Sequence, residues 1–181
     1  MPEEKVVAPE VTKEINDLVA KGVKALEEFE NLNQEQIDYI VAKCCVAGLD
    51  HHGTLAKAAI DETHRGVFED KATKNLFACE YVQNNMRSLK TVGVVSNNPV
   101  TGITEIAEPV GVICGITPVT NPTSTVIFKS LICLKTRNPI IFAFHPSAQQ
   151  SSKQAAVLMK EVAEAAGAPK NCIQWIEHPS M

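Results

Sequence analysis

The 181-residue sequence lacks the motifs that identify a cofactor or a metal site most directly. No G-x-G-x-x-G follows a predicted strand: Gly111 and Gly115 are wrongly spaced and lie within the strand itself, so the standard Rossmann pyrophosphate loop is absent. The six cysteines include no C-x-x-C pair, and the adjacent Cys44 and Cys45 point in different directions on a helix. We therefore expect structural cysteines and no metal site.

Long apolar runs and basic runs are also missing. The longest uncharged stretch, residues 109–128, contains three prolines and two glycines and would make a poor membrane helix. The first ten residues are acidic and have no apolar core, so they do not predict a secretory signal, and we expect a cytoplasmic protein. No Lys- or Arg-rich run of the kind that binds nucleic acid occurs. Neither a membrane nor a nucleic acid is expected as a partner.

Residues 1–90 predict a helical amino-terminal part. Apolar residues from Val11 to Phe29 follow helix spacing, although Gly22 weakens the middle. Asn33 and Gln36 form a capping-box pattern at the start of the next helix. Two more helices are predicted at about 54–62 and 70–86, the last with Leu76, Phe77, Tyr81 and Val82 facing inward.

After this helical part, apolar and polar residues alternate with a period of two residues, as in a β-strand. Thr91 to Val95 and Ile103 to Ala107 alternate in polarity and are separated by seven residues rich in turn formers. Residues 91–108 therefore predict a β-hairpin arm.

Residues 109–181 predict a parallel βαβαβ unit, which makes the fold class α/β. Gly111 to Ile116 reads as a short strand buried on both faces, and it ends where Pro118 and Pro122 have no N–H to donate. Helical spacing from Thr123 leads to a second strand, residues 140–144. Ser147 then caps a helix over 148–166, and a third strand covers 172–176.

The ends of these strands predict a ligand site. Open α/β sheets bind ligands beyond the carboxyl ends of their strands, so residues 117–122 and 145–147 should lie side by side at such a site. Residues 109–181 hold 6 basic and 3 acidic groups, against 11 and 18 in residues 1–108. The positive balance suits an anionic cofactor without identifying one. A loop whose prolines only end a strand is the alternative.

A sheet that ends at its third strand leaves an apolar edge without cover. A complete doubly wound domain needs roughly two to three more strands. The sequence therefore predicts part of a larger enzyme, with a small domain whose helices wrap the exposed edge as the alternative.

Two stretches carry a resemblance to a known family. They are EPVGVICGITPVTNPTSTVIFKSLICLKTRNPIIFAFHPSA (108–148) and FEDKATKNLFACEYV (68–82). Both resemble the aldehyde dehydrogenase superfamily, and within it the CoA-acylating part of bifunctional aldehyde–alcohol dehydrogenases. The resemblance covers nearly the whole chain and implies a Rossmann-like half-sheet of the aldehyde dehydrogenase fold.

The resemblance implies a reversible reaction in which acyl-CoA and NADH give aldehyde, CoA and NAD through a cysteine thioester. For acetyl-CoA the product is acetaldehyde, as in fermentative ethanol metabolism. The family's nucleophilic cysteine lies downstream of Glu177, so the resemblance implies an amino-terminal portion that is inactive alone. It also implies that the 91–108 arm packs against a neighbouring subunit of a homo-oligomer, whereas the residues alone allow an intrachain hairpin equally.

The resemblance implies NAD as the cofactor, although the family binds it without the glycine fingerprint. In the family, the segment that matches 116–121 lines the nicotinamide and ribose side of the cleft, and the one that matches 145–147 faces the adenosine ribose. The implied cofactor residues are Ile116, Thr117, Pro118, Val119, Thr120, Asn121, His145, Pro146 and Ser147.

This chain departs from the family pattern in both segments. Most non-acylating members carry T-P-x-N-x-P, where the asparagine amide donates to the substrate oxyanion. Here Thr120 occupies that position and the amide comes one residue later, at Asn121. Either Asn121 is the oxyanion donor, or Thr120 and a backbone N–H take its place.

His145 replaces a lysine of many non-acylating members. Imidazole is mostly neutral at pH 7, and a fixed cation would favour a 2′-phosphate, so NAD is expected in preference to NADP. A non-catalytic module of the same fold that binds a nucleotide or mediates assembly is the alternative function.

Overall fold

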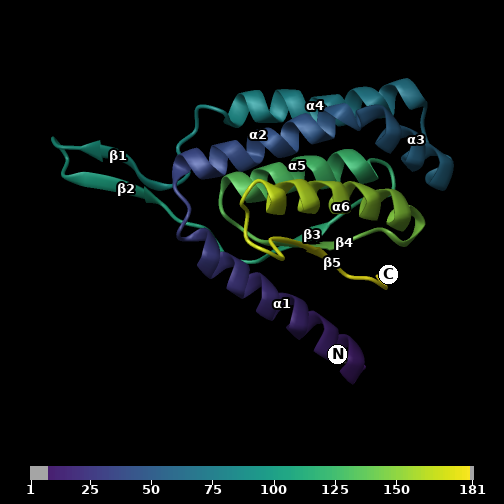
Figure 1. Cartoon of the computed structure of the whole chain (residues 1–181), viewed down its shortest axis with the longest axis horizontal. Helices are drawn as coiled ribbons and strands as arrows, with labels where there is room; N and C mark the ends of the chain where they lie inside the picture. Colours follow the sequence, from purple (N-terminus) through teal and green to yellow (C-terminus); the bar gives the residue numbers. More distant parts are fainter. Residues whose placement is uncertain (1–7, 180–181) are drawn as a thin grey trace, which may run out of the picture.

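The structure, a computed structural model, describes residues 8–179 and shows an α/β fold with helices on both faces of a small parallel sheet (Figure 1). Residues 1–7, on which the prediction about a secretory signal partly rests, and 180–181, the end of the predicted 109–181 unit, lie outside the described residues. The predicted helical amino-terminal part is confirmed. Its helices are α1 (Pro9–Phe29), α2 (Gln34–Asp50), α3 (His52–Thr63) and α4 (Phe68–Met86).

Local sequence signals explain where two of these helices lie. The Gln36 N–H donates to Asn33 Oδ1 (3.0 Å) and the Asn33 N–H donates to Gln36 Oε1 (2.9 Å), so the predicted capping box starts α2. Gly22 is buried in the middle of α1, where a Cβ would lie 3.0 Å from a methyl of Val112. The glycine therefore permits the close approach of α1 to the segment before the sheet.

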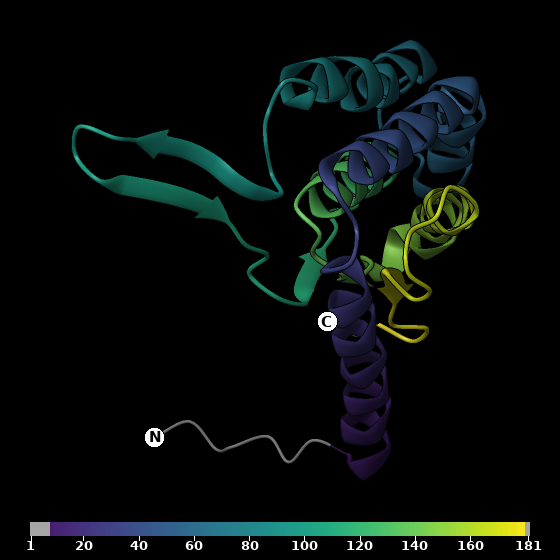
Figure 2. The same ribbon diagram turned by 60° about the vertical axis from the view of Figure 1, so that its left-hand side comes forward.

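The predicted hairpin is confirmed, with its first strand shifted along the chain. Strand β1 (Gly93–Asn98) pairs antiparallel with β2 (Ile103–Ala107), and the register shifts between Val94 and Ser96. The turn is closed by the Gly102 N–H, which donates to the Asn98 carbonyl (2.9 Å), and Gly102 has a φ of +69°. The hairpin projects away from the body of the molecule in two views (Figures 1 and 2).

The predicted βαβαβ unit is confirmed. Strands β3 (Ile113–Ile116), β4 (Ile140–Ala143) and β5 (Ile173–Trp175) are parallel in the order β3-β4-β5. Helices α5 (Pro122–Lys135) and α6 (Gln149–Ala165) lie on one face of this sheet, and α1 lies on the other (Figures 1 and 2). Helices α2 and α4 form a further layer over α5 and α6.

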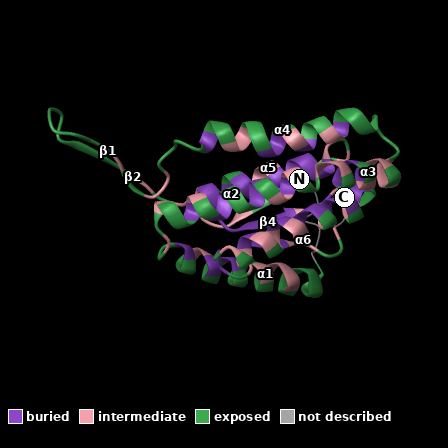
Figure 3. Ribbon diagram, turned by 45° about the horizontal axis from the view of Figure 1, so that its top comes forward, coloured by how far each residue is buried: buried purple, intermediate pink, exposed green. Residues whose placement is uncertain are grey.

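The core lies where these layers meet, and Figure 3 shows its buried residues on the facing sides of α2, α5, α6 and β4. No described helix is long and apolar enough to cross a membrane. The largest fully buried side chains are Phe29, Ile37, Ile40, Val41, Leu55, Ile127, Leu131, Leu134, Ile140, Phe142, Met159 and Ile173.

Two predicted burial patterns are wrong. Strand β3 is buried on one face alone: Gly115 is buried, whereas Cys114 is exposed and Ile116 is 69% exposed, because β3 lies at the edge of the sheet and α1 packs against β4. In α4, Phe77 and Tyr81 are 56% and 58% exposed and stack on each other with ring centroids 5.0 Å apart. The inward face of α4 instead carries Lys71 and Asn75 with small and sulfur-containing residues.

Candidate functional site

The carboxyl ends of β3 and β4 lie side by side, as predicted. The register pairs Ile116 with Ala143, and the Thr117 N–H donates to the Ala143 carbonyl (3.1 Å). The segment after β3 (116–121, the first loop) and the segment after β4 (145–147, the second loop) therefore leave the same edge of the sheet.

Two lysines hold backbone carbonyls of the first loop. Lys129 of α5 donates to the Ile116 carbonyl (2.7 Å), and Lys71 of α4 donates to the Thr120 carbonyl (2.8 Å). Lys71 is only 6% exposed, and burial, followed by the charge of Lys74, lowers its pKa. A buried ammonium needs partners, so the first loop and Lys71 stabilise each other.

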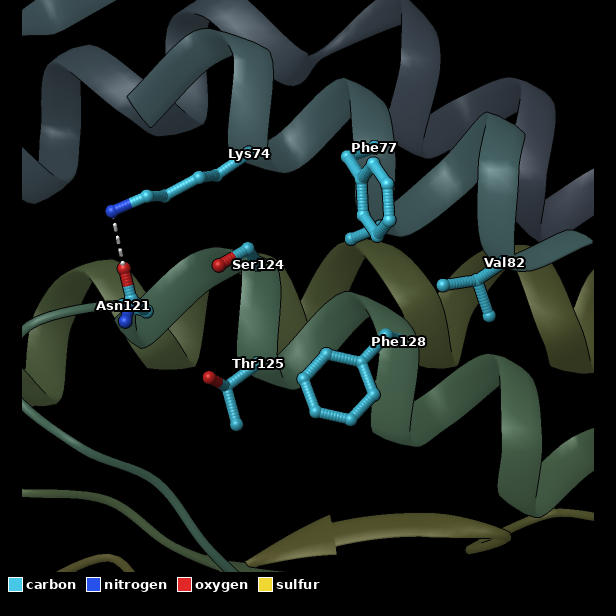
Figure 4. A pocket seen from close by; sticks show the side chains of 8 residues that line it. Lys74, Phe77, Val82, Asn121, Ser124, Thr125 and Phe128 are labelled. Carbon is cyan, nitrogen blue, oxygen red and sulfur yellow. Dashed lines mark hydrogen bonds between the residues drawn. The ribbon is translucent and has the colours of Figure 1, made fainter. Parts of the chain in front are cut away.

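A third lysine holds the side chain of Asn121. Lys74 Nζ lies 3.1 Å from Asn121 Oδ1 and donates to it. Figure 4 shows the amide oxygen facing Lys74 and the amide nitrogen on the other side. Asn121 is also the N-cap residue of α5, yet its side chain accepts no bond from the helix. The amide oxygen is thus used by Lys74 and not by the local cap that asparagine usually forms.

Asn75 of α4 is hydrogen-bonded to residues of α3 and α5 near the first loop. Its side chain is 1% exposed, donates to the His52 carbonyl (2.8 Å) and accepts from the Thr123 hydroxyl (2.9 Å). Lys71, Lys74 and Asn75 are spaced as neighbours on one face of α4. That face therefore contacts consecutive parts of the chain from Thr120 to Thr123.

The three lysines that hold the first loop have no close counter-ion. Within residues 8–179, no carboxylate oxygen lies within 4.0 Å of the ammonium groups of Lys71, Lys74 or Lys129. The lysine ammonium groups beside the first loop are therefore not neutralised by a close ion pair among these residues, which favours an anionic ligand.

A cavity of about 420 Å³ lies between α4 and α5, beside Asn121 (Figure 4). Its lining is mostly apolar, with polar groups near the amino-terminal end of α5, which is typical of small-molecule sites. The lining residues are Lys74, Phe77, Ala78, Val82, Asn121, Ser124, Thr125 and Phe128.

The second loop is held by a bond within itself. His145 Nδ1 lies 3.1 Å from the Ser147 backbone nitrogen and accepts its N–H. Residues 145–147 include no lysine or arginine. The second loop therefore offers no permanently charged cation of its own.

The predicted cap by Ser147 is wrong. After a short 3₁₀ turn (Pro146–Ala148), α6 begins, and its first N–H groups are bound by Glu62 of α3. Glu62 Oε1 accepts from the Gln150 N–H (2.8 Å) and Oε2 accepts from the Ser151 N–H (2.7 Å). A carboxylate at this position also interacts favourably with the helix dipole.

Five of the six cysteines are buried, as expected of structural cysteines, whereas Cys114 is exposed on β3. Burial raises the pKa of Cys44, Cys79, Cys133 and Cys172 to about 12, so these thiols are poor nucleophiles. No group of three His, Cys, Asp or Glu side chains placed to hold a metal occurs in the part of the chain that the structure describes.

Comparison with known proteins identifies the family. The profile of the aldehyde dehydrogenase family matches residues 6–180. The chain belongs to this family. An aldehyde-alcohol dehydrogenase from Streptococcus pneumoniae is 67% identical over 180 residues, which cover 99% of this chain and 20% of that protein.

Solved structures agree with this membership. The crystal structure of an acetylating aldehyde dehydrogenase from Geobacillus thermoglucosidasius superposes with a TM-score of 0.91 at 44% identity, over 93% of this chain and 37% of that one. An engineered glycolyl-CoA reductase with bound NADP⁺ superposes with a TM-score of 0.76 at 27% identity, over 92% of this chain and 37% of that one. The chain spans about a fifth of the length of the aldehyde-alcohol dehydrogenases from Entamoeba histolytica and Streptococcus pneumoniae that it matches.

The structure thus brings the sequence-predicted residues of both loops to one edge of the sheet. Sequence reasoning missed the side chains that hold them: Lys71, Lys74, Asn75, Lys129 and Glu62. One signal was present, because K-x-x-K-N places three polar residues on one helix face that would otherwise be apolar.

Proposed function

We propose that this chain forms the amino-terminal part of an NAD-dependent acylating aldehyde dehydrogenase, which converts acetyl-CoA, NADH and a proton to acetaldehyde, CoA and NAD⁺. Membership of the aldehyde dehydrogenase family and the names of the similar proteins support the reaction class. The two neighbouring loops support the location of the cofactor.

The residues of both loops fit a dinucleotide. Lys71, Lys74 and Lys129 make the first loop electropositive, which suits an anionic ligand. The Thr117 N–H donates to the Ala143 carbonyl, which holds the start of the first loop beside the end of β4. Residues 116–121 would hold the nicotinamide and ribose, and 145–147 the adenosine ribose. The bound nicotinamide supplies the hydride.

The absence of a lysine or arginine from residues 145–147 supports NAD in preference to NADP, because a 2′-phosphate gains most from a fixed cation. The similar reductase with bound NADP⁺ supports a nicotinamide cofactor in general. The preference for NAD therefore rests on the second loop of this chain.

Asn121 is the proposed oxyanion donor. Its amide nitrogen is on the side away from Lys74 and makes one long contact, 3.4 Å, to Thr120 Oγ1 (Figure 4). An N–H remains to donate to the oxygen of the acyl group as negative charge develops there. The apolar cavity between α4 and α5 would receive the alkyl part of the acyl group.

The hairpin arm is the proposed contact with a second subunit of a homo-oligomer. Val94, Ile103 and Ile106 are 53–59% exposed, and Val100 is 92% exposed. An arm that projects from the body with apolar side chains on its surface is typical of an interface. We also propose that the protein is located in the cytoplasm.

The observation that carries this proposal is the placement of the Asn121 amide at the polar end of an apolar cavity, next to the strand-end loops. The test measures acetyl-CoA-dependent NADH oxidation by the full-length protein that carries this chain, with CoA released in equal amount. We expect turnover by the full-length protein and none by residues 1–181 alone. Absence of NADH oxidation with acetyl-, propionyl- and butyryl-CoA would contradict the proposal.

A further inference from the structure

We propose that Lys74 is a positioning residue: it selects the orientation of the Asn121 carboxamide, so that the amide nitrogen and not the oxygen faces the substrate. This inference rests on the proposed oxyanion role of Asn121. It adds a residue from a different helix, 47 positions earlier in the chain, whose effect on the reaction passes through Asn121.

The two ends of a carboxamide have nearly the same shape but opposite hydrogen-bonding character. An oxyanion donor works only if the nitrogen end faces the substrate, so something must fix the orientation. A lysine ammonium carries three donors and no acceptor. It therefore donates only to the oxygen end of Asn121, at 3.1 Å, and a flipped amide would lose this bond and set N–H groups against a cation.

The end of α5 offers the amide oxygen of Asn121 a second partner, the N–H groups of the first helical turn. Asparagine at an N-cap usually accepts an N–H of the first helical turn through its side-chain oxygen. Asn121 occupies the N-cap of α5 and makes no such bond. Without Lys74, the amide oxygen is free to return to the helix end, and the nitrogen would turn with it.

The surroundings of Lys74 make it available for this role. Its ammonium group has no carboxylate within 4.0 Å among residues 8–179, so it is not held by a competing ion pair. One turn away, Lys71 fixes the Thr120 carbonyl, and Asn75 fixes the Thr123 hydroxyl. The chain on both sides of Asn121 is thus held to α4, through the Thr120 carbonyl and the Thr123 side chain, and Lys74 contacts the amide between them.

The test is a double-mutant cycle in the full-length protein, with kcat and KM for acetyl-CoA as readouts. Asn121→Ala removes the donor and should lower kcat about 100-fold or more. Lys74→Met should lower kcat about tenfold with KM changed less than about twofold, because the orientation is lost but the donor remains. In the Asn121→Ala background, Lys74→Met should lower kcat less than about twofold further. Lys74→Arg, which also only donates, should restore most of the activity.

Asn121→Asp separates positioning from folding. A carboxylate here pairs with Lys74 but offers no N–H, so the variant should keep its melting temperature and still lose kcat to the level of Asn121→Ala. Lys24→Met is the matched control, because Lys24 is exposed on α1 and has no ion pair or side-chain hydrogen bond with the described residues. It should leave kcat unchanged.

The outcomes separate this inference from the proposed function. An unchanged kcat in Asn121→Ala would remove the oxyanion role and this inference with it. A large loss in Asn121→Ala with none in Lys74→Met would overturn only the inference. Independent, multiplicative losses in the double variant would also overturn it, since Lys74 would then act without Asn121. If Lys74→Met fails to fold, Lys74→Arg and Asn121→Asp decide: loss of kcat in folded Lys74→Arg, or retention of kcat in Asn121→Asp, would overturn it.

Discussion

The two loops at the carboxyl edge of the sheet differ in what holds them. The first loop is held from outside, by Lys71 and Lys74 of α4 and by Lys129 of α5. The second loop is held by its own His145–Ser147 bond. The first is therefore fixed by tertiary structure and has lysines of α4 and α5 beside it, whereas the second is locally determined and includes no lysine or arginine. The proposed function places the geometry-sensitive chemistry at the first loop and the cofactor preference at the second.

The largest effect is expected on stability, when the side chain of α4 that supports the first loop is removed. Asn75→Ala leaves the His52 carbonyl and the Thr123 hydroxyl without their partner in a buried site, which should lower the free energy of unfolding by about 2–3 kcal/mol. Urea denaturation measures this change. Asn84→Ala, at an exposed position of the same helix, should change it by less than about 0.5 kcal/mol. Equal stabilities of the two variants would show that α4 does not support the first loop.

A smaller effect tests whether the first loop binds cofactor. Pro118→Gly adds backbone freedom and Thr120→Val removes a hydroxyl, and both residues are exposed. Each should raise the dissociation constant for NADH in the full-length protein about fivefold to tenfold, with little change in melting temperature. Calorimetric titration measures the constant, and unchanged affinity in both variants would remove the first loop from the cofactor site.

The smallest effect is expected on cofactor preference, and it tests the role of the second loop. His145→Lys adds a fixed cation, which should shift the ratio of NADPH to NADH affinity toward NADPH by about fivefold, and less at high salt. His51→Lys adds the same charge at an exposed position between α2 and α3 and serves as the control. An equal shift in both variants would mean that net charge, and not the position of His145, sets the preference.

The fold was predictable where short-range signals determine it. The Asn33–Gln36 capping box, the hairpin and the βαβαβ succession depend on spacing within a few residues, and the structure confirms them. The adjacency of the two loops followed from the rule that parallel strands end at the same edge.

Features that depend on distant parts of the chain were not predictable in the same way. Cys114 and Ile116 are exposed because β3 lies at the edge of the sheet, and no local sequence pattern indicates the order of the strands. Glu62 replaces Ser147 as the partner of the α6 N-terminus because the fold brings α3 beside it. In α4, apolarity suggested that Phe77 and Tyr81 face inward, but the contacts of Lys71 and Asn75 with the first loop and α5 determine the face.

Hydrogen exchange of the full-length protein with and without NADH tests the central claim most directly, that both loops form the cofactor site. The account predicts slower exchange of the amides in 117–121 and 145–147 when NADH is bound. The hairpin amides, 93–107, should exchange at the same rate in both samples. Binding of NADH without protection in either loop would contradict the account.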